Sequence, residues 1–85
     1  MPFQKEHAAR QLDPRGFLRF ARKRLAPGVS AILGIDVQGT SHVQSLRFEK
    51  DHFTPAEARG WLARHGFNTE LEEARDDGSF VHWPA

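Results

Sequence analysis

The chain contains no cysteine, and this limits how its 85 residues can be held together. Without cysteine there is no disulfide, no thiolate nucleophile, no cysteine-ligated zinc and no iron–sulfur cluster. A chain of this length cannot divide its apolar residues between two cores, and surface scaling buries about 64% of its surface on folding. The sequence therefore predicts a single domain with one modest core that packing alone stabilises.

Composition places the chain among globular proteins, because 39% of its residues are hydrophobic and 27% are charged. No apolar stretch approaches the roughly 20 residues that a membrane helix needs. The first residues, MPFQKEHAAR, also lack the continuous apolar core of a signal peptide. We therefore expect a cytoplasmic protein that does not bind membranes.

The net charge of +1 conceals two unequal halves. Residues 1–30 hold seven Lys or Arg against two acids, whereas residues 31–85 hold five against nine. A chain with this asymmetry can present a basic face to nucleic acid or an acidic face to a basic partner. The two halves can equally attract each other across the fold, and the sequence leaves these alternatives open.

The first 26 residues predict an arm followed by a helix. Residues 1–11 show little apolar periodicity and are expected to form a mobile arm. Asp13-Pro14 has the pattern of an N-cap followed by proline at the first helical position, and Pro27-Gly28 ends the helix. At about 100° per residue, most apolar side chains fall on one side of this helix. The other side carries four cations, Arg15, Arg19, Arg22 and Lys23.

Residues 29–50 predict an antiparallel hairpin. The segment from Val29 to Val37, VSAILGIDV, is rich in β-branched and aliphatic residues and follows no helix cap. After a turn at residues 38–41, the segment HVQSLRFEK alternates between two sets of side chains. One face takes Val43, Ser45, Arg47 and Glu49, and the other takes Gln44, Leu46, Phe48 and Lys50.

The second helix has the most complete set of terminal signals. Thr54-Pro55-Ala56-Glu57 is a capping box with proline at its first helical position. Gly66 stands where a helix end favours a left-handed residue, and Phe67 follows it. Within the helix, Gly60 costs about 1 kcal/mol relative to alanine, which suggests a close backbone approach at that point.

Residues 68–83 fit two structures. Asn68 can cap a two-turn helix or open a strand, but Arg75-Asp76-Asp77-Gly78 predicts a turn and the next residues, SFVHW, are β formers. We therefore predict a second hairpin. The expected fold is a single α+β domain over residues 12–85, in the order helix, hairpin, helix, hairpin. Its four strands would form one antiparallel sheet with two helices on one face.

A series of short motifs runs through residues 43–83, about half of the chain. They are an apolar strand ending in Arg-Phe, an aromatic residue followed by Thr, then Glu-Ala, Trp-Leu and His-Gly-Phe. This series resembles a small domain of phage and prophage head-morphogenesis regions, which occurs alone or joined to prohead proteases. The residues that carry the match are Arg47, Phe48, Phe53, Thr54, Glu57, Ala58, Trp61, Leu62, His65, Gly66 and Phe67.

The resemblance implies a protein of phage or prophage origin that works during head assembly. Such a protein would lie in the cytoplasm of the bacterial host cell or be associated with the virion. Residues 79–83, SFVHW, depart from the arginine-rich final strand of such domains. We carry over no proteolytic activity from the proteases to which the domain can be joined.

No residue pattern points to catalysis or to a bound cofactor. None of the five histidines stands four residues from another, the spacing that aims two imidazoles at one metal ion from a helix. No serine lies in a G-x-S-x-G motif, and the glycines form no phosphate-binding loop. We therefore expect no enzymatic activity, no cofactor, no metal and no small-molecule substrate.

The candidate binding residues are the four cations of the first helix and one tryptophan. The cations could each approach a phosphate, although no exposed aromatic residue interleaves them. Trp61 is expected in the core, whereas Trp83, close to the end of the sequence, is the candidate interface anchor. We expect a protein-binding module, with nucleic-acid binding through the basic helix as the alternative. Inhibition of a host defence complex, through a surface that mimics a natural ligand, is a third hypothesis.

Overall fold

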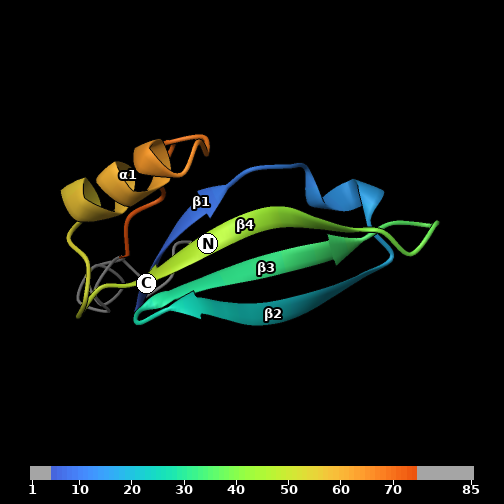
Figure 1. Cartoon of the computed structure of the whole chain (residues 1–85), viewed down its shortest axis with the longest axis horizontal. Helices are drawn as coiled ribbons and strands as arrows, with labels where there is room; N and C mark the ends of the chain where they lie inside the picture. Colours follow the sequence, from blue (N-terminus) through green and yellow to red (C-terminus); the bar gives the residue numbers. More distant parts are fainter. Residues whose placement is uncertain (1–4, 75–85) are drawn as a thin grey trace, which may run out of the picture.

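The computed structural model describes residues 5–74, which form one antiparallel sheet, one α-helix and one short 3₁₀-helix. In chain order the elements are β1 (Glu6–Arg10), η1 (Pro14–Gly16), β2 (Arg19–Ala26), β3 (Val29–Ile35), β4 (Ser41–Glu49) and α1 (Pro55–Arg64). The spatial order of the strands is β1-β4-β3-β2 (Figure 1). Hairpins join β2, β3 and β4, whereas the chain crosses the end of the sheet between β1 and β2. β1 and β2 therefore form the two opposite edges of the sheet.

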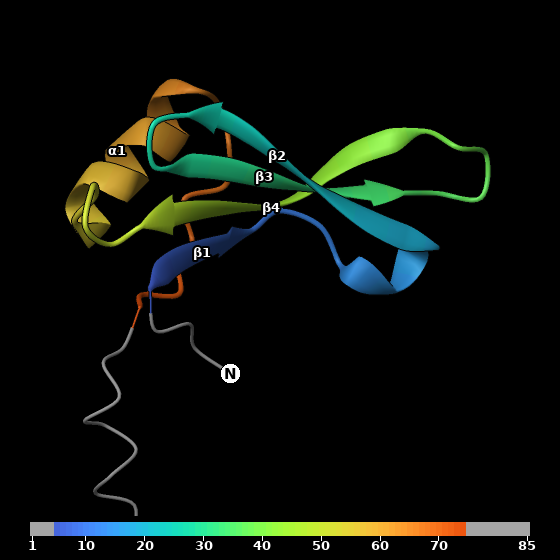
Figure 2. The ribbon, with the colours of Figure 1, turned by 90° about the horizontal axis from the view of Figure 1, so that it is seen from below.

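The core lies between α1 and one face of the sheet (Figure 2). Ala58 and Leu62 of α1 are fully buried, as are Leu46 and Phe48 of β4. The Phe48 ring meets the Trp61 ring edge-on, with ring centroids 5.6 Å apart. The remaining buried members of this cluster, from β1 and β3, are Ala9, Val29 and Ala31.

Both predicted ends of the second helix are confirmed in α1. The Thr54 hydroxyl accepts a hydrogen bond from the Glu57 N–H at 3.1 Å, and the Glu57 carboxylate accepts one from the Thr54 N–H at 2.8 Å. At the other end Gly66 has a φ of 77°, and the Phe67 N–H donates to the Leu62 carbonyl at 2.9 Å. These bonds satisfy backbone groups that a helix end otherwise leaves without partners.

The predicted hairpin of residues 29–50 is confirmed as β3 and β4. Ala31 lies opposite Leu46 in the register, and both side chains are buried under α1. The predicted alternation is confirmed between positions 45 and 49, because Ser45 and Arg47 lie on the other face of the sheet. It is wrong at Val43, which lies opposite Leu33 and packs against the core, because the register of β3 and β4 shifts just before this pair. This alternation gives the sheet one apolar face and one polar face.

The predicted first helix is wrong. Asp13 does cap a helix, since its side chain accepts the Arg15 N–H at 2.9 Å, but that helix is the three-residue η1. β2 follows, and Pro27-Gly28 forms the turn into β3 instead of a helix end. Every residue of β2 before Ala26 is exposed, so no buried face imposes a two-residue period on its sequence. Its apolar spacing fits a helix, while pairing with β3 makes it a strand.

The mobile arm predicted over residues 1–11 is wrong for residues 6–10, where β1 pairs with β4 along its whole length. Residues 1–4 of that arm lie outside the described residues. Ala8 and Ala9 are buried in the sheet. His7 is buried as well, and its Nε2 lies 3.0 Å from the Phe53 carbonyl oxygen. The strand has only five residues, and its apolar residues are two adjacent alanines, so it produces no periodicity that would have predicted it.

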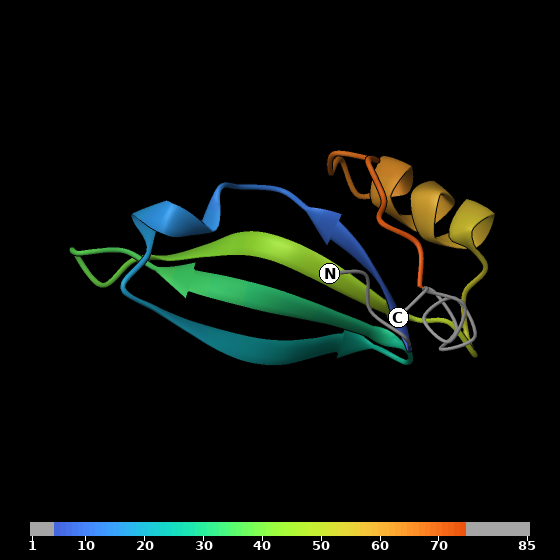
Figure 3. The same cartoon turned by 180° about the vertical axis from the view of Figure 1, so that it is seen from behind.

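The predicted arrangement of two helices on one face is also wrong, because α1 is the single α-helix within residues 5–74. The sheet has the predicted four antiparallel strands, but two of them, β1 and β2, come from segments that were predicted as an arm and a helix. Residues 68–74 run back from α1 beside β1 (Figure 3), and two backbone hydrogen bonds of 2.9 and 2.7 Å join Glu72 to Ala8. The turn and final strand predicted over residues 75–83 lie outside the described residues.

Candidate interaction surface

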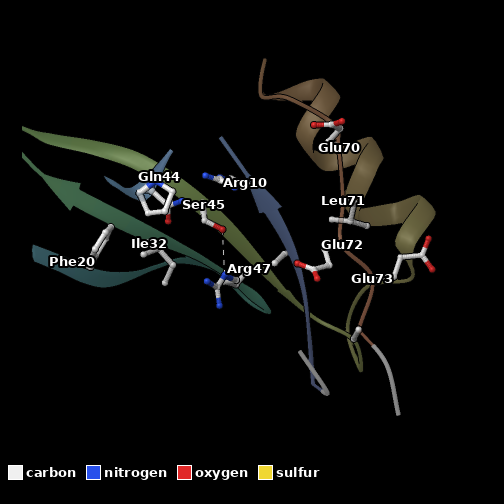
Figure 4. Close-up of a pocket in the computed structure, with 13 residues that line it drawn as sticks. Arg10, Phe20, Ile32, Gln44, Ser45, Arg47, Glu70, Leu71, Glu72 and Glu73 are labelled. Atoms are coloured by element: carbon white, nitrogen blue, oxygen red, sulfur yellow. Dashed lines mark hydrogen bonds between the residues drawn. The ribbon is translucent and has the colours of Figure 1, made fainter. Parts of the chain in front are cut away.

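The face of the sheet opposite α1 is covered by no α-helix in the described part of the chain, and it contains a groove of about 1200 Å³ (Figure 4). Arg47 and Ser45 of β4 lie on the floor of this groove, beside Ile32 of β3 and Phe20 of β2. Residues 70–74 line its other side. We call this side of the sheet the open face.

Arg47 is the most enclosed of the arginines on the open face, with a side chain that is 18% exposed. Its Nε donates to the Ser45 hydroxyl at 3.3 Å, and its Nη1 lies 3.9 Å from a Glu6 carboxylate oxygen. Burial lowers the pKa of Arg47 from its ordinary value, and the charge of Glu6 opposes that change. A guanidinium held in such a groove is a strong donor to carboxylate or carbonyl oxygens.

Acidic side chains alternate with the other arginines of the open face. Arg22 of β2 forms an ion pair with Glu6 of β1 across the sheet. Arg24 lies further along β2, and its Nη2 is 3.8 Å from a Glu49 carboxylate oxygen. Exposed pairs of this kind contribute about 1 kcal/mol or less each. The pairs matter more for the charge of the surface than for stability. They make the open face a balanced mixture of positive and negative side chains instead of a positive patch.

Glu72 adds a further carboxylate to this mixture. Ala8 lies opposite Arg47 in the register of β1 and β4, and Glu72 bridges to the outer side of Ala8. Because directly opposed residues of neighbouring strands share a face, these three side chains form one row across the sheet. The charge of Glu72 also opposes the lowering of the Arg47 pKa that burial causes. The segment after α1 thus brings negative charge to the rim of the groove.

Aromatic side chains form the other end of the open face. The Phe17 ring covers Gly34 so closely that a Cβ on this glycine would lie 2.4 Å from it. Phe17 meets Phe20 edge-on with ring centroids 6.0 Å apart, and its centroid is 5.7 Å from that of His42. Phe20 is nevertheless 48% exposed. An exposed aromatic ring beside arginines has the composition of a protein interface.

The four cations that were predicted to share one helical face are separated in the structure. Arg15 lies in η1, where its Nη2 donates to the Asp13 carboxylate at 2.6 Å and lowers the pKa of that carboxyl below its ordinary value. Arg22 lies on the open face. Arg19 and Lys23 stand an odd number of residues from Arg22, so they point to the face that carries α1.

Sequence reasoning missed Arg47 and Phe20 as surface residues of one site. A signal for Arg47 existed in the alternation of residues 43–50, which placed it on a polar face. Phe20 gave no such signal, because the predicted helix assigned it to the apolar side. Trp61, expected in the core, is partly buried and stacks on His65 with ring centroids 3.9 Å apart. Trp83, the predicted interface anchor, lies outside the described residues.

Two kinds of side-chain arrangement are absent from the described residues. Within residues 5–74 no three acidic or histidine side chains gather into a metal site, and no serine hydroxyl hydrogen-bonds to a histidine. His7 uses both ring nitrogens inside the fold, because its Nδ1 also accepts the Ala74 N–H at 2.8 Å. In this part of the chain, no helix has both the length and the apolar character needed to cross a membrane.

No family model, curated protein or solved structure matches the chain. The resemblance of residues 43–83 to the phage domain therefore stays a prediction.

Proposed function

We propose that the chain is a non-enzymatic protein-binding module of phage or prophage origin that acts in head assembly. The observation that carries the binding role is the open face, where a groove joins an exposed phenylalanine, an enclosed arginine and balanced ion pairs. Aromatic and arginine side chains are enriched in protein interfaces and dominate their energetics. The link to head assembly rests on the sequence resemblance of residues 43–83.

The balance of charges on the open face favours a protein partner over a polyanion. Glu6 already pairs with Arg22 and lies beside Arg47. The Glu6 carboxylate would repel a phosphate that approached either arginine. Such a contact would also release fewer counterions than a contact with an unpaired cation. A protein surface can instead match both signs of charge and the apolar ring of Phe20.

Affinity capture from phage-producing cells tests this function. The tagged chain is expected to retain a virion or assembly protein. Phe20→Ala should weaken retention by roughly tenfold or more, because truncating an interface anchor commonly costs about 2 kcal/mol. Val37→Ala is the matched control, since Val37 is 77% exposed in the loop between β3 and β4 and does not line the groove. Recovery of no such protein, or an equal loss in both variants, would contradict the proposal.

Nucleic-acid binding along β2 is the second candidate, and one observation favours it. Arg19 and Lys23 have no acidic partner among the described residues, whereas Arg22 and Arg24 have one each. This candidate predicts a mobility shift of nucleic acid at low salt that disappears in the double variant Arg19→Glu, Lys23→Glu. If the unchanged protein causes no shift at low salt, the candidate is excluded.

A further inference from the structure

β2 is an edge strand whose outer side is open in the described structure. β3 pairs with its inner side from Arg19 through Ala26. No backbone hydrogen bond joins its outer side to the rest of residues 5–74. The strand is eight residues long, and all but Ala26 are exposed. An edge with these properties is a template on which another strand can pair.

The residues of β2 are basic on both faces of the sheet. Its sequence, RFARKRLA, contains four cations and no acid. Arg22 and Arg24 lie on the open face, and Arg19 and Lys23 lie on the opposite face. A strand added beside β2 would therefore meet positive charge above and below its backbone. Large apolar side chains of β2 are also exposed, so such a strand could bury apolar side chains as well.

At the opposite edge of the same sheet, an acidic segment already pairs with β1. Residues 70–73, with the sequence ELEE, run beside β1 and are joined to it at Glu72. Leu71 packs against the core, and Glu73 forms an ion pair of 3.1 Å with Arg59 of α1. Glu72 lies in the row of Arg47 on the open face. An acidic extended segment with an apolar side chain thus already extends this sheet at its β1 edge.

We propose that β2 binds an acidic extended segment of the protein partner as an added strand. The proposal rests on the protein-binding function above and specifies its binding mode and the chemistry of the partner. Backbone hydrogen bonds to the outer side of β2 would hold the segment, and its acidic side chains would select it. A second copy of β2 is excluded as the occupant, because its cations would face those of the first copy.

A synthetic peptide of eight residues, the length of β2, tests the proposal directly. The probe alternates glutamate and valine and carries a fluorophore, and its binding to the full chain is followed by fluorescence polarisation. One control peptide replaces each valine by proline, which keeps the charge but cannot complete a strand ladder. A second control replaces each glutamate by lysine. We expect saturable binding of the acidic probe alone, with slower amide hydrogen exchange in β2 and no change in α1.

Charge reversal on the protein provides the complementary measurement. Arg19→Glu with Lys23→Glu should weaken binding of the acidic probe by roughly tenfold or more, because neither side chain has an acidic partner in the described structure to lose. Arg64→Glu, on the exposed surface of α1, is the control with the same kind of charge change and should bind the probe nearly as the parent does.

Equal binding of the valine and proline peptides would overturn the proposal, since it would reduce the interaction to charge without strand pairing. Absence of binding by the acidic probe would overturn it as well. Neither result would touch the capture experiment with Phe20→Ala, which tests the open face. The strand-addition mode and the protein-binding function therefore fail separately.

Discussion

Gly60 is a residue whose presence in α1 the structure does not require. The sequence suggested a close backbone approach at this position, and that suggestion is wrong. A Cβ added to Gly60 would meet only the tip of the Arg64 side chain, at 3.3 Å, which can move away. The glycine therefore costs helix stability without permitting a contact.

Gly60→Ala is expected to raise the free energy of unfolding by about 0.5–1 kcal/mol, because alanine loses less backbone entropy in a helix. Urea unfolding followed by circular dichroism measures the change. Gly66→Ala provides the opposite case on the same helix, since Gly66 has a φ of 77° and alanine is strained there. A loss of stability in Gly60→Ala would mean that a larger side chain is not accommodated at this position.

Asp36 organises the loop between β3 and β4 through its carboxylate. One oxygen accepts the N–H groups of Gln38 and Thr40, both at 2.9 Å, and the other lies 2.9 Å from His42 Nε2. The hydrogen bond with His42, followed by that from Thr40, holds the pKa of Asp36 below its ordinary value of 3.8. The folded state therefore favours the ionised carboxylate more strongly than the unfolded chain does.

This preference predicts a stability difference that depends on pH. The contribution of Asp36 is complete above its unfolded pKa and is lost as the pH falls through the lower folded pKa. Asp36→Asn lacks this titration, so the difference in unfolding free energy between parent and variant should shrink as the pH is lowered below about 4. Denaturant unfolding at a series of pH values measures it. A difference that stays constant in that range would show that the ionised form has no special role in the loop.

At the scale of elements, α1 joins the sheet through one buried aromatic ring. Phe48 is fully buried and meets the rings of Phe53 and Trp61 edge-on, at centroid distances of 5.2 and 5.6 Å. Trp61 is only partly buried, and besides Phe48 its ring contacts the exposed His65 and the partly buried Phe67. Phe48 should therefore contribute more to the attachment of the helix than Trp61 does.

Phe48→Ala is expected to cost about 3–5 kcal/mol, and Trp61→Ala less. A domain of this size has roughly 4 to 13 kcal/mol of total stability, so Phe48→Ala can unfold it entirely. Phe48→Leu keeps most of the apolar volume and allows the comparison to be made in a folded protein. Thermal and urea unfolding of the set give the order. A larger loss from Trp61→Ala than from Phe48→Ala would move the centre of the core to the tryptophan.

The elements that the sequence predicted correctly are those with local causes. The capping box of α1 involves residues three positions apart, and its terminating motif spans Leu62 to Phe67, so both are visible in a short stretch of sequence. β2 has no local cause of this kind. Its apolar residues fit a helical period, and it forms a strand because it pairs with the edge of β3 that β4 leaves free. That pairing depends on the whole sheet and leaves no signal within residues 19–26.

The residues of the open face also fall into two groups, those that the sequence placed on this face and those that only the structure brings there. The alternation of Ser45, Arg47 and Glu49 placed these side chains on one polar face from the sequence alone. Their association with Arg22 depends on β2 being a strand, and their association with Glu72 depends on the path of the chain after α1. Both follow from tertiary pairing, so the sequence could supply members of the site but not the site itself.

At the scale of the whole molecule, distant segments meet at β1. β4 pairs with its inner side, and residues 70–74 run along its outer side. His7 connects them, because one ring nitrogen faces the Phe53 carbonyl and the other accepts the Ala74 N–H. The β1 edge of the sheet is thereby covered, whereas the β2 edge is left open. The asymmetry of the sheet thus depends on the strand that the sequence had assigned to a mobile arm.

Ala9→Asp tests whether β1 is an integral part of the fold. Ala9 has no exposed surface and lies opposite Leu46 in the sheet, so an aspartate there would be an unpaired charge inside the core. We expect a loss of more than about 3 kcal/mol, seen as a large fall in the urea midpoint or as loss of the cooperative transition. Lys5→Asp introduces the same side chain at an exposed position one residue before β1, and it should stay within about 0.5 kcal/mol of the parent. A mobile arm would tolerate both changes equally, and that result would remove β1, and with it the covered side of the sheet, from the fold.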